Sequence, residues 1–155
     1  MDATALARTL LEPVPANRTA GIEVVRAEDG AAEVALETPD ALRNVIGSLH
    51  ASGLVTLIDA AGLAALVAAC EEPAQFEGVV PLGAAATMEF LAPARGRLVA
   101  SCVLGADERA ALRPLLAGES DRTRIATVAE VRDAAGEVVC RGGFDWSVRR
   151  LPGAR

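Results

Sequence analysis

The sequence predicts an α+β fold in which an antiparallel sheet wraps around one long helix. The predicted elements run in the order helix, two strands, long helix and four strands, so the strands come in runs instead of alternating with helices. The long helix, expected over residues 49–70, is apolar nearly all round, which is typical of a helix buried on several sides. With 155 residues, 52% of them hydrophobic, the chain can bury a real core, and we expect a single domain over residues 1–155.

In the first half of the chain, residues 1–20 are expected to form an amphipathic lead-in helix, because leucines recur on one helical face before two prolines interrupt the pattern. Two segments of alternating apolar and polar residues follow. The turn signal Glu28-Asp29-Gly30 separates them, so they should form a hairpin. Ser48 then stands where a serine can cap the long helix.

The second half is rich in strand patterns. We expect strands over residues 79–93, 96–105, 122–133 and 136–150. Between the middle two lies a segment, residues 106–120, that has the character of an insertion and is predicted to hold a short helix capped by Asp107.

The composition excludes several classes of protein. A net charge of −6 and only four aromatic residues argue against a nucleic-acid partner. Cys70, Cys102 and Cys140 are odd in number and far apart, which argues against a disulfide scaffold or a zinc site, and we expect no bound metal. The start of the chain lacks a signal-peptide pattern, and the apolar run over residues 54–69 is interrupted by Asp59 and too short to span a bilayer. We therefore expect a cytoplasmic protein with no membrane partner.

Three polar residues stand within or beside this apolar run: Asn44, His50 and Asp59, at spacings of six and nine. A buried polar group costs a few kcal/mol unless it is paired or used. The pattern N-x-x-G-x-x-H-A-S-x-x-x-x-x-x-D, followed downstream by TMEFLAPARGRL, resembles the hotdog-fold acyl-CoA thioesterases of the phenylacetate-pathway type and related hotdog proteins. The order of elements agrees with that family over roughly residues 21–148.

The resemblance implies a hotdog fold and hydrolysis of the thioester of an acyl-CoA or of an acyl group on a carrier protein. It implies no cofactor, since coenzyme A is part of the substrate. The corresponding site residues are Asn44, His50, Ala51 and Asp59. The sequence departs from the family at Ala51, where glycine is usual, and at Gly83, where some relatives carry a hydroxyl residue.

The spacing of His50 and Asp59 predicts a dimer. Nine residues of helix span about 13 Å and place two side chains on opposite faces, so both can serve one carbonyl only if they come from different copies of the chain. A homodimer would then carry two composite sites, and two dimers can pair into a homotetramer.

Each of these residues has a predicted role. The free N–H of Ala51, at the positive end of the helix dipole, can hold an oxyanion. Asp59 would be a general base or a nucleophile that forms a mixed anhydride. Asn44 would orient the thioester or the water, and His50 would organise the turn or hydrogen-bond the carbonyl.

Structural alternatives stand beside these roles. Asp59 can be a structural residue at the dimer seam, Asn44 a turn former, and His50 a loop residue with a satisfied hydrogen bond. The arginines near the sheet edge can bind the phosphates of coenzyme A or form an ordinary solvated surface; they are Arg95, Arg97 and Arg122. For the whole chain, the alternatives to a thioesterase are a non-hydrolytic hotdog protein that binds acyl thioesters, and a hotdog dehydratase.

Overall fold

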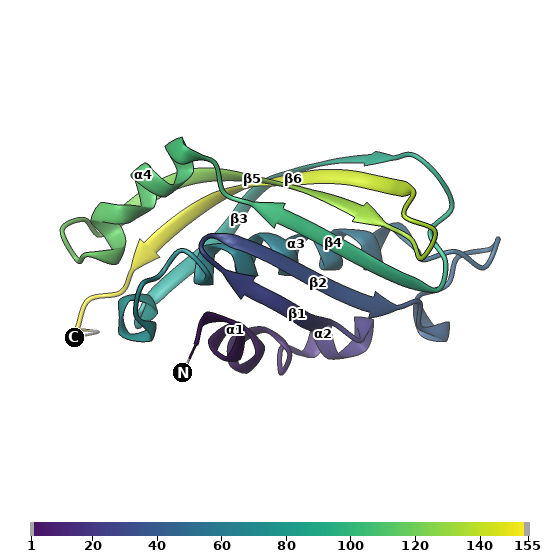
Figure 1. Cartoon of the computed structure of the whole chain (residues 1–155), viewed down its shortest axis with the longest axis horizontal. Coiled ribbons are helices and arrows are strands. Elements are labelled where there is room, and N and C mark those ends of the chain that lie inside the picture. The colour runs from purple at the N-terminus through teal and green to yellow at the C-terminus, as the bar shows by residue number, and fades with distance from the viewer. Residues whose placement is uncertain (1, 154–155) are drawn as a thin grey trace.

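The computed structural model describes residues 2–153. Its helices are α1 (Ala3–Leu11), α2 (Pro15–Ala20), α3 (Ala51–Val67) and α4 (Ala106–Leu116), with 3-10 turns η1 (Asp40–Leu42) and η2 (Pro73–Phe76). Its strands are β1 (Glu23–Glu28), β2 (Ala31–Glu37), β3 (Val79–Phe90), β4 (Arg97–Val103), β5 (Arg122–Arg132) and β6 (Val138–Arg150). They form one antiparallel sheet, in the order β1-β2-β4-β5-β6-β3, that curves around α3 (Figure 1). The predicted α+β architecture, an antiparallel sheet wrapped around one long helix, is confirmed.

The central helix α3 is buried because its apolar residues face the sheet and the N-terminal helices. Its largest fully buried side chains include Leu57, Ile58 and Leu66. The helix approaches the sheet closely at Gly62, where a Cβ atom would lie 2.7 Å from the hydroxyl oxygen of Thr127. That hydroxyl accepts a 2.8 Å hydrogen bond from the indole N–H of Trp146. A side chain at position 62 would therefore push α3 away from the sheet.

The sheet contains two hairpins, the first of which was predicted from the sequence. Strands β1 and β2 are joined by Asp29 and Gly30, whose φ angles of 48° and 70° give the left-handed pair that suits a two-residue hairpin. Strands β5 and β6 pair across residues 133–137. Consecutive strands β3 and β4 do not pair: β3 pairs with β6, whereas β4 lies between β2 and β5. Strand β3 is therefore an edge of the sheet.

The helix boundaries correct the sequence predictions. The long helix spans residues 51–67 instead of 49–70, and its N-cap is His50, not Ser48. The helix in the 106–120 segment follows Gly105, and Asp107 lies in its first turn instead of capping it.

The lead-in region is also more complex than predicted. It holds two helices because Pro15 starts the second one, a position at which its missing N–H costs nothing.

The end of β6 is joined to α4 by the Arg150 guanidinium. Its nitrogens donate to the carbonyl of Leu115 at 3.0 and 3.1 Å and to that of Leu116 at 3.3 Å. They also donate to the carbonyls of Gln75 and Glu77 at 2.7 and 2.8 Å. One positive charge therefore satisfies carbonyls at the C-terminal end of α4 and in the segment around η2.

We expect Arg150→Met to lower the free energy of unfolding by about 2–4 kcal/mol, because it leaves several partly buried carbonyls without a donor. For a chain of this length that corresponds to a fall in Tm of about 6–12 °C. Thermal and urea unfolding measure it. Arg149→Met is the matched control: this neighbouring arginine is exposed and has no ion pair with a described residue, so its loss should change stability by less than about 0.5 kcal/mol. Equal effects of the two substitutions would contradict the assigned role.

Candidate functional site

Asn44 organises the loop that leads into α3. Its side-chain oxygen accepts hydrogen bonds of 3.1 Å from the backbone N–H groups of Ile46 and Ser48, and its amide donates to the Ser48 hydroxyl at 2.7 Å. The Asn44 backbone N–H also bonds the Ser48 carbonyl at 2.8 Å. All of these contacts lie within the turn, so in the isolated chain Asn44 acts as a turn former, and its amide is already engaged.

His50 is the N-cap of α3. Its Nδ1 accepts the backbone N–H of Ser52 at 3.1 Å and lies 2.8 Å from the Ser52 hydroxyl. Because Nδ1 accepts, the proton of the neutral ring belongs on Nε2. The His50 side chain is exposed, so this Nε2–H is available as a donor beside the helix start.

One N–H group at the start of α3 is free. The first N–H groups of a helix have no intrahelical acceptor, and here most of them are used. Those of Gly53 and Leu54 bond the His50 carbonyl at 2.9 and 3.3 Å, and that of Ser52 bonds the His50 ring. The Ala51 N–H has no acceptor among the described residues, and Ala51 is exposed. The helix start can therefore hold one oxygen that carries negative charge.

Asp59 lies further along α3, about 13 Å from His50 along the helix axis. It is half-buried, on a stripe of the helix that the chain's own sheet leaves partly open, together with Val55, Thr56 and Leu63. Its carboxylate makes no hydrogen bond or ion pair with any described residue. Burial removes water from the carboxylate and raises the pKa of Asp59 to about 6. An unpaired carboxylate with such a pKa can exchange a proton near neutral pH.

Two of the three predicted phosphate-binding arginines are engaged within the chain. Arg95 donates to the backbone carbonyl of Ile46 at 2.9 Å. Arg97 pairs with Glu23 at 3.1 Å and with Glu37 at 3.8 Å. Both therefore have structural partners at the end of the sheet that holds the Asn44 turn.

Arg122 lies at the other end of the sheet. It begins β5, whereas Arg132, at the far end of that strand, pairs with β4 close to Arg97. The ten residue steps from Arg122 to Arg132 span about 33 Å, so one chain does not bring the three predicted arginines together.

No group of three or more histidine, cysteine, aspartate or glutamate side chains within residues 2–153 could hold a metal ion. Cys70, Cys102 and Cys140 are free, and burial raises the pKa of the Cys70 and Cys102 thiols to about 11. Such thiols are poor nucleophiles at neutral pH. None of the helices in the described part of the chain combines the length and hydropathy of a membrane-spanning segment.

Sequence reasoning missed the Ser52 hydroxyl, which joins the His50 ring, and Arg124 and Arg149, which lie beside Arg122 on the sheet. The period of a strand could have placed Arg122 and Arg124 on one face. Nothing in the sequence fixes which residue of β6 lies opposite them.

Comparison with known proteins gives a family and a fold. The model of a domain family described as Domain of unknown function (DUF4442) matches residues 3–148. No curated protein matches the chain.

Solved structures match over nearly the whole length. A Pseudomonas aeruginosa protein of unknown function, described as a probable thioesterase, is 25% identical, with a TM-score of 0.76 over 96% of each chain. A Shewanella oneidensis protein, provisionally named a thioesterase, is 14% identical, with a TM-score of 0.77 over 96% of this chain and 97% of its own. A second Pseudomonas aeruginosa protein is 20% identical, with a TM-score of 0.67 over 86% and 93%.

Proposed function

Because the chain belongs to the DUF4442 family and shares the hotdog fold of thioesterase-superfamily structures, we propose that it is a thioesterase that hydrolyses acyl-CoA or a carrier-bound acyl thioester. The similarity to proteins named as thioesterases supports a function within that superfamily. The assignment of substrate and residues is ours and depends on the geometry of α3.

The observation that carries the proposal is the contrast between two groups on α3. The Ala51 N–H is free at the start of the helix, and the Asp59 carboxylate is unpaired and half-buried on its open stripe. Thioester hydrolysis requires a donor for the oxyanion and a base for the water, and these two groups supply one of each.

The reaction balances with these groups. As Asp59 accepts a proton from water, the water oxygen bonds to the thioester carbon, and the negative charge moves to the carbonyl oxygen held by the Ala51 N–H. The oxyanion then re-forms the carbonyl and the carbon–sulfur bond breaks. The leaving sulfur takes the proton back from Asp59, so the products are a carboxylic acid and a thiol. Asp59 as a nucleophile would give the same products through a mixed anhydride.

Both groups can reach one thioester in a homodimer built on β3. This edge strand leaves its backbone unpaired on one side, and most of its side chains are exposed, among them Leu82 and Phe90 at 52% and 55%. Natural proteins rarely leave so long an apolar edge open. Pairing two β3 strands about a two-fold axis would bring the open stripes of two α3 helices together, Asp59 of one copy facing the helix start of the other. A further pairing of dimers into a tetramer stays a prediction.

A non-hydrolytic acyl-thioester-binding protein is the second candidate, favoured by the site of Gly83. Gly83 supplies no hydroxyl group, and a Cβ atom added there would lie 3.2 Å from a ring carbon of Phe144, so the ring would have to shift by a few tenths of an ångström.

The experiment that tests the proposed function is release of free thiol from short-chain, aromatic and long-chain acyl-CoAs and from acyl-pantetheine. We expect turnover well above the uncatalysed rate on at least one of these substrates. A chain that binds a non-hydrolysable acyl-CoA analogue but releases no thiol from any of them would contradict hydrolysis and favour the binding protein.

A further inference from the structure

Three arginines lie together on the outer face of the sheet, the face turned away from α3. Arg122 and Arg124 share that face because they alternate with the buried Ile125 on β5. The register places Arg149 of β6 directly opposite Arg122 and Ser147 opposite Arg124. We call Arg122, Arg124 and Arg149 the arginine cluster; all three side chains are exposed.

None of the three cluster arginines forms an ion pair within residues 2–153, although the Asp145 carboxylate lies on the same face of the sheet. Most arginines of residues 2–153 donate to a carboxylate or a backbone carbonyl of the chain. Five do not: Arg18, Arg113, Arg122, Arg124 and Arg149. Three of these five therefore form the cluster, and two face each other across neighbouring strands, where like charges destabilise a sheet. In a chain of net charge −6, a group of three arginines without an ion pair suits an anionic ligand.

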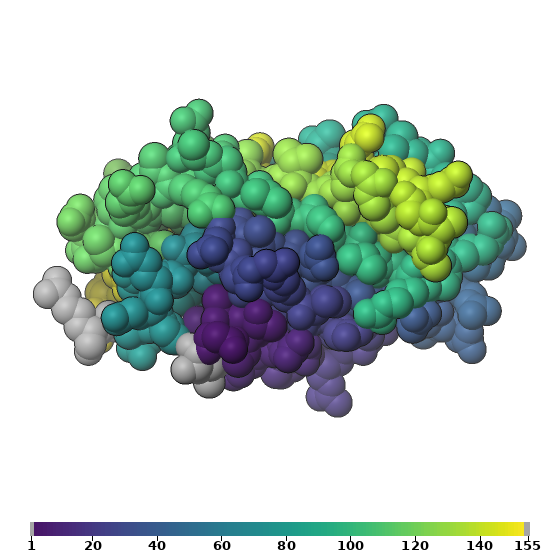
Figure 2. All heavy atoms as spheres, viewed as in Figure 1, coloured from purple at the N-terminus to yellow at the C-terminus, as the bar shows by residue number. Residues whose placement is uncertain are grey.

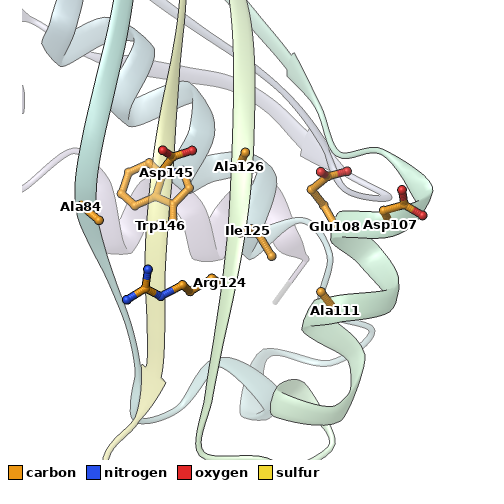
Figure 3. Close-up of a pocket in the computed structure, with 9 residues that line it drawn as sticks. All are labelled: Ala84, Asp107, Glu108, Ala111, Arg124, Ile125, Ala126, Asp145 and Trp146. Atoms are coloured by element: carbon orange, nitrogen blue, oxygen red, sulfur yellow. The ribbon is translucent and has the colours of Figure 1, made fainter.

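A groove adjoins the cluster. It has a volume of about 400 Å³ and lies between α4 and the outer face of β5, β6 and β3. In Figure 3 the Arg124 side chain extends across β6 toward Ala84, while the carboxylates of Asp107 and Glu108 lie on the α4 side. Arg124 makes no ion pair with them or with Asp145. The groove thus presents an arginine at one side and the two α4 carboxylates at the other, with alanines and the Asp145 carboxylate between them.

We propose that this part of the sheet binds the nucleotide end of coenzyme A: the arginine cluster holds the phosphates, and the groove beside it receives the adenosine. The proposal rests on the thioesterase function proposed above, and it names the substrate as an acyl-CoA. Guanidinium groups match phosphate oxygens in pairs, and three of them suit a ligand that carries a diphosphate and a separate monophosphate. The carboxylates of Asp107 and Glu108 can accept hydrogen bonds from the adenine amino group and the ribose hydroxyl. A groove of this volume is within the usual range for small-molecule sites.

The position of the cluster suits the composite site. Trp146 lies over Gly62, one helical turn from Asp59, on the inner face of the sheet, and Arg149 is three residues further along β6, about 10 Å, on the outer face. Because Arg149 and Arg122 lie at the strand ends, the pantetheine arm of coenzyme A would pass round those ends to reach Asp59. The cluster is at the α4 end of the molecule, whereas the segment leading into α3 is at the opposite end (Figures 1 and 2). In a dimer whose β3 strands pair antiparallel, the helix start of the partner comes to the α4 end of this chain. The cluster would then serve the site that combines this chain's Asp59 with the partner's Ala51.

A compact cluster favours coenzyme A over a carrier protein. The three arginines occupy neighbouring positions on two strands, which suits several phosphates on one small molecule. A carrier protein offers a single phosphodiester on its prosthetic arm and spreads its other charges over a helix surface, which would call for a longer basic stripe.

The test is calorimetric titration of three proteins with coenzyme A, 3′-dephospho-coenzyme A and pantetheine. The first protein is the wild type, and the second is the cluster variant, Arg122→Gln/Arg124→Gln/Arg149→Gln. The third is the control, Arg18→Gln/Arg26→Gln/Arg132→Gln. The control removes the same charge elsewhere on the chain. We expect the cluster variant to bind coenzyme A at least about tenfold more weakly than the wild type, and the control to bind it within about twofold. Pantetheine should not distinguish the three proteins. For hydrolysis, KM for acyl-CoA should rise by a similar factor while turnover of acyl-pantetheine is unchanged.

The results separate this proposal from the proposed function. If the cluster variant binds coenzyme A more weakly and the wild type releases no thiol, the nucleotide site is supported and the thioesterase function is overturned. Thiol release with coenzyme A affinity unchanged in the cluster variant supports the thioesterase and overturns the nucleotide site. The nucleotide site is also overturned if the wild type does not bind coenzyme A at millimolar concentration. Faster turnover of a carrier-bound substrate would then identify a carrier protein as the source of the thioester.

Discussion

Asp59→Asn is expected to lower kcat for thioester hydrolysis by about a thousandfold or more and, at the same time, to stabilise the fold. The amide keeps the size of the carboxylate but cannot take a proton from water or attack the thioester carbon. Thiol release measures the first effect and thermal unfolding the second. Size-exclusion chromatography with light scattering should show the same oligomeric state for the variant and the wild type.

The stability effect has a definite sign. Burial raises the pKa of Asp59 from 3.8 to about 6, so the folded chain binds a proton more tightly than the unfolded chain does. The stabilisation by protonated Asp59 is complete below pH 3.8 and is lost as the pH rises through about 6. At pH 7 the ionised carboxylate therefore lowers the free energy of unfolding, and we expect Asn to recover about 1–3 kcal/mol. At pH 3 the two proteins should be nearly equal in stability.

The same titration governs activity. The base must be ionised, so kcat/KM of the wild type should fall tenfold per pH unit below about pH 6. A structural role for Asp59 predicts the reverse pattern: Asn would lower the stability and leave the pH profile unchanged. Full activity in an intact Asp59→Asn protein would overturn the mechanism.

Ala51→Pro is expected to lower kcat by about a hundred- to a thousandfold with little change in stability, because it removes one N–H group and almost nothing else. Proline is well tolerated at the first position of a helix, and the φ and ψ of His50, −61° and 150°, suit a residue that precedes proline. Ala51 is exposed, so no buried contact is lost. Steady-state thiol release and thermal unfolding measure the two effects.

Two controls accompany this variant. Ala51→Gly keeps the N–H and should retain activity within about threefold, at a small cost in helix stability.

Mixing inactive Ala51→Pro with inactive Asp59→Asn tests the composite site: if subunits exchange at random, half of the dimers are mixed and each has one unaltered site. About a quarter of wild-type activity should then return. No recovery in verified mixed dimers would show that both groups serve the same chain's site.

The helices, strands and turns could be predicted from the sequence, whereas the pairing of distant strands and other long-range contacts could not. Local signals were enough for the Asp29-Gly30 hairpin and the apolar helix, because turn chemistry and periodicity operate over a few residues. The pairing of β3 with β6 could not be read in this way, since the two strands are about fifty residues apart and the choice depends on the whole sheet. The role of Arg150 was invisible for the same reason: its five hydrogen bonds reach carbonyls far away in the chain.

For the candidate site, the pattern around Asn44, His50 and Asp59 indicated a helix that starts close to residue 50, but not which atoms were still free. Ser48 was predicted as the N-cap because serine is common at that position. Its hydroxyl instead accepts a hydrogen bond from the Asn44 amide, and the His50 ring is the N-cap. The pKa of Asp59 is raised because burial removes water from its carboxylate. That Ala51 retains the one free N–H at the helix start depends on the bonds of its neighbours, which only the folded chain reveals.

The strand order has a consequence for synthesis of the protein. Among residues 2–153 strand β3 pairs only with β6, which follows it by about fifty residues, so during translation those residues must be added before β3 can join the sheet. Until then the segment LGAAATM has no partner strand on either edge and can pair with strands of other newly made chains. A chain that terminates before residue 138 would lack the strand that holds β3 in register, and we expect it to aggregate instead of folding with a missing edge. In the proposed dimer, pairing of two β3 strands would therefore begin only after β6 has been made.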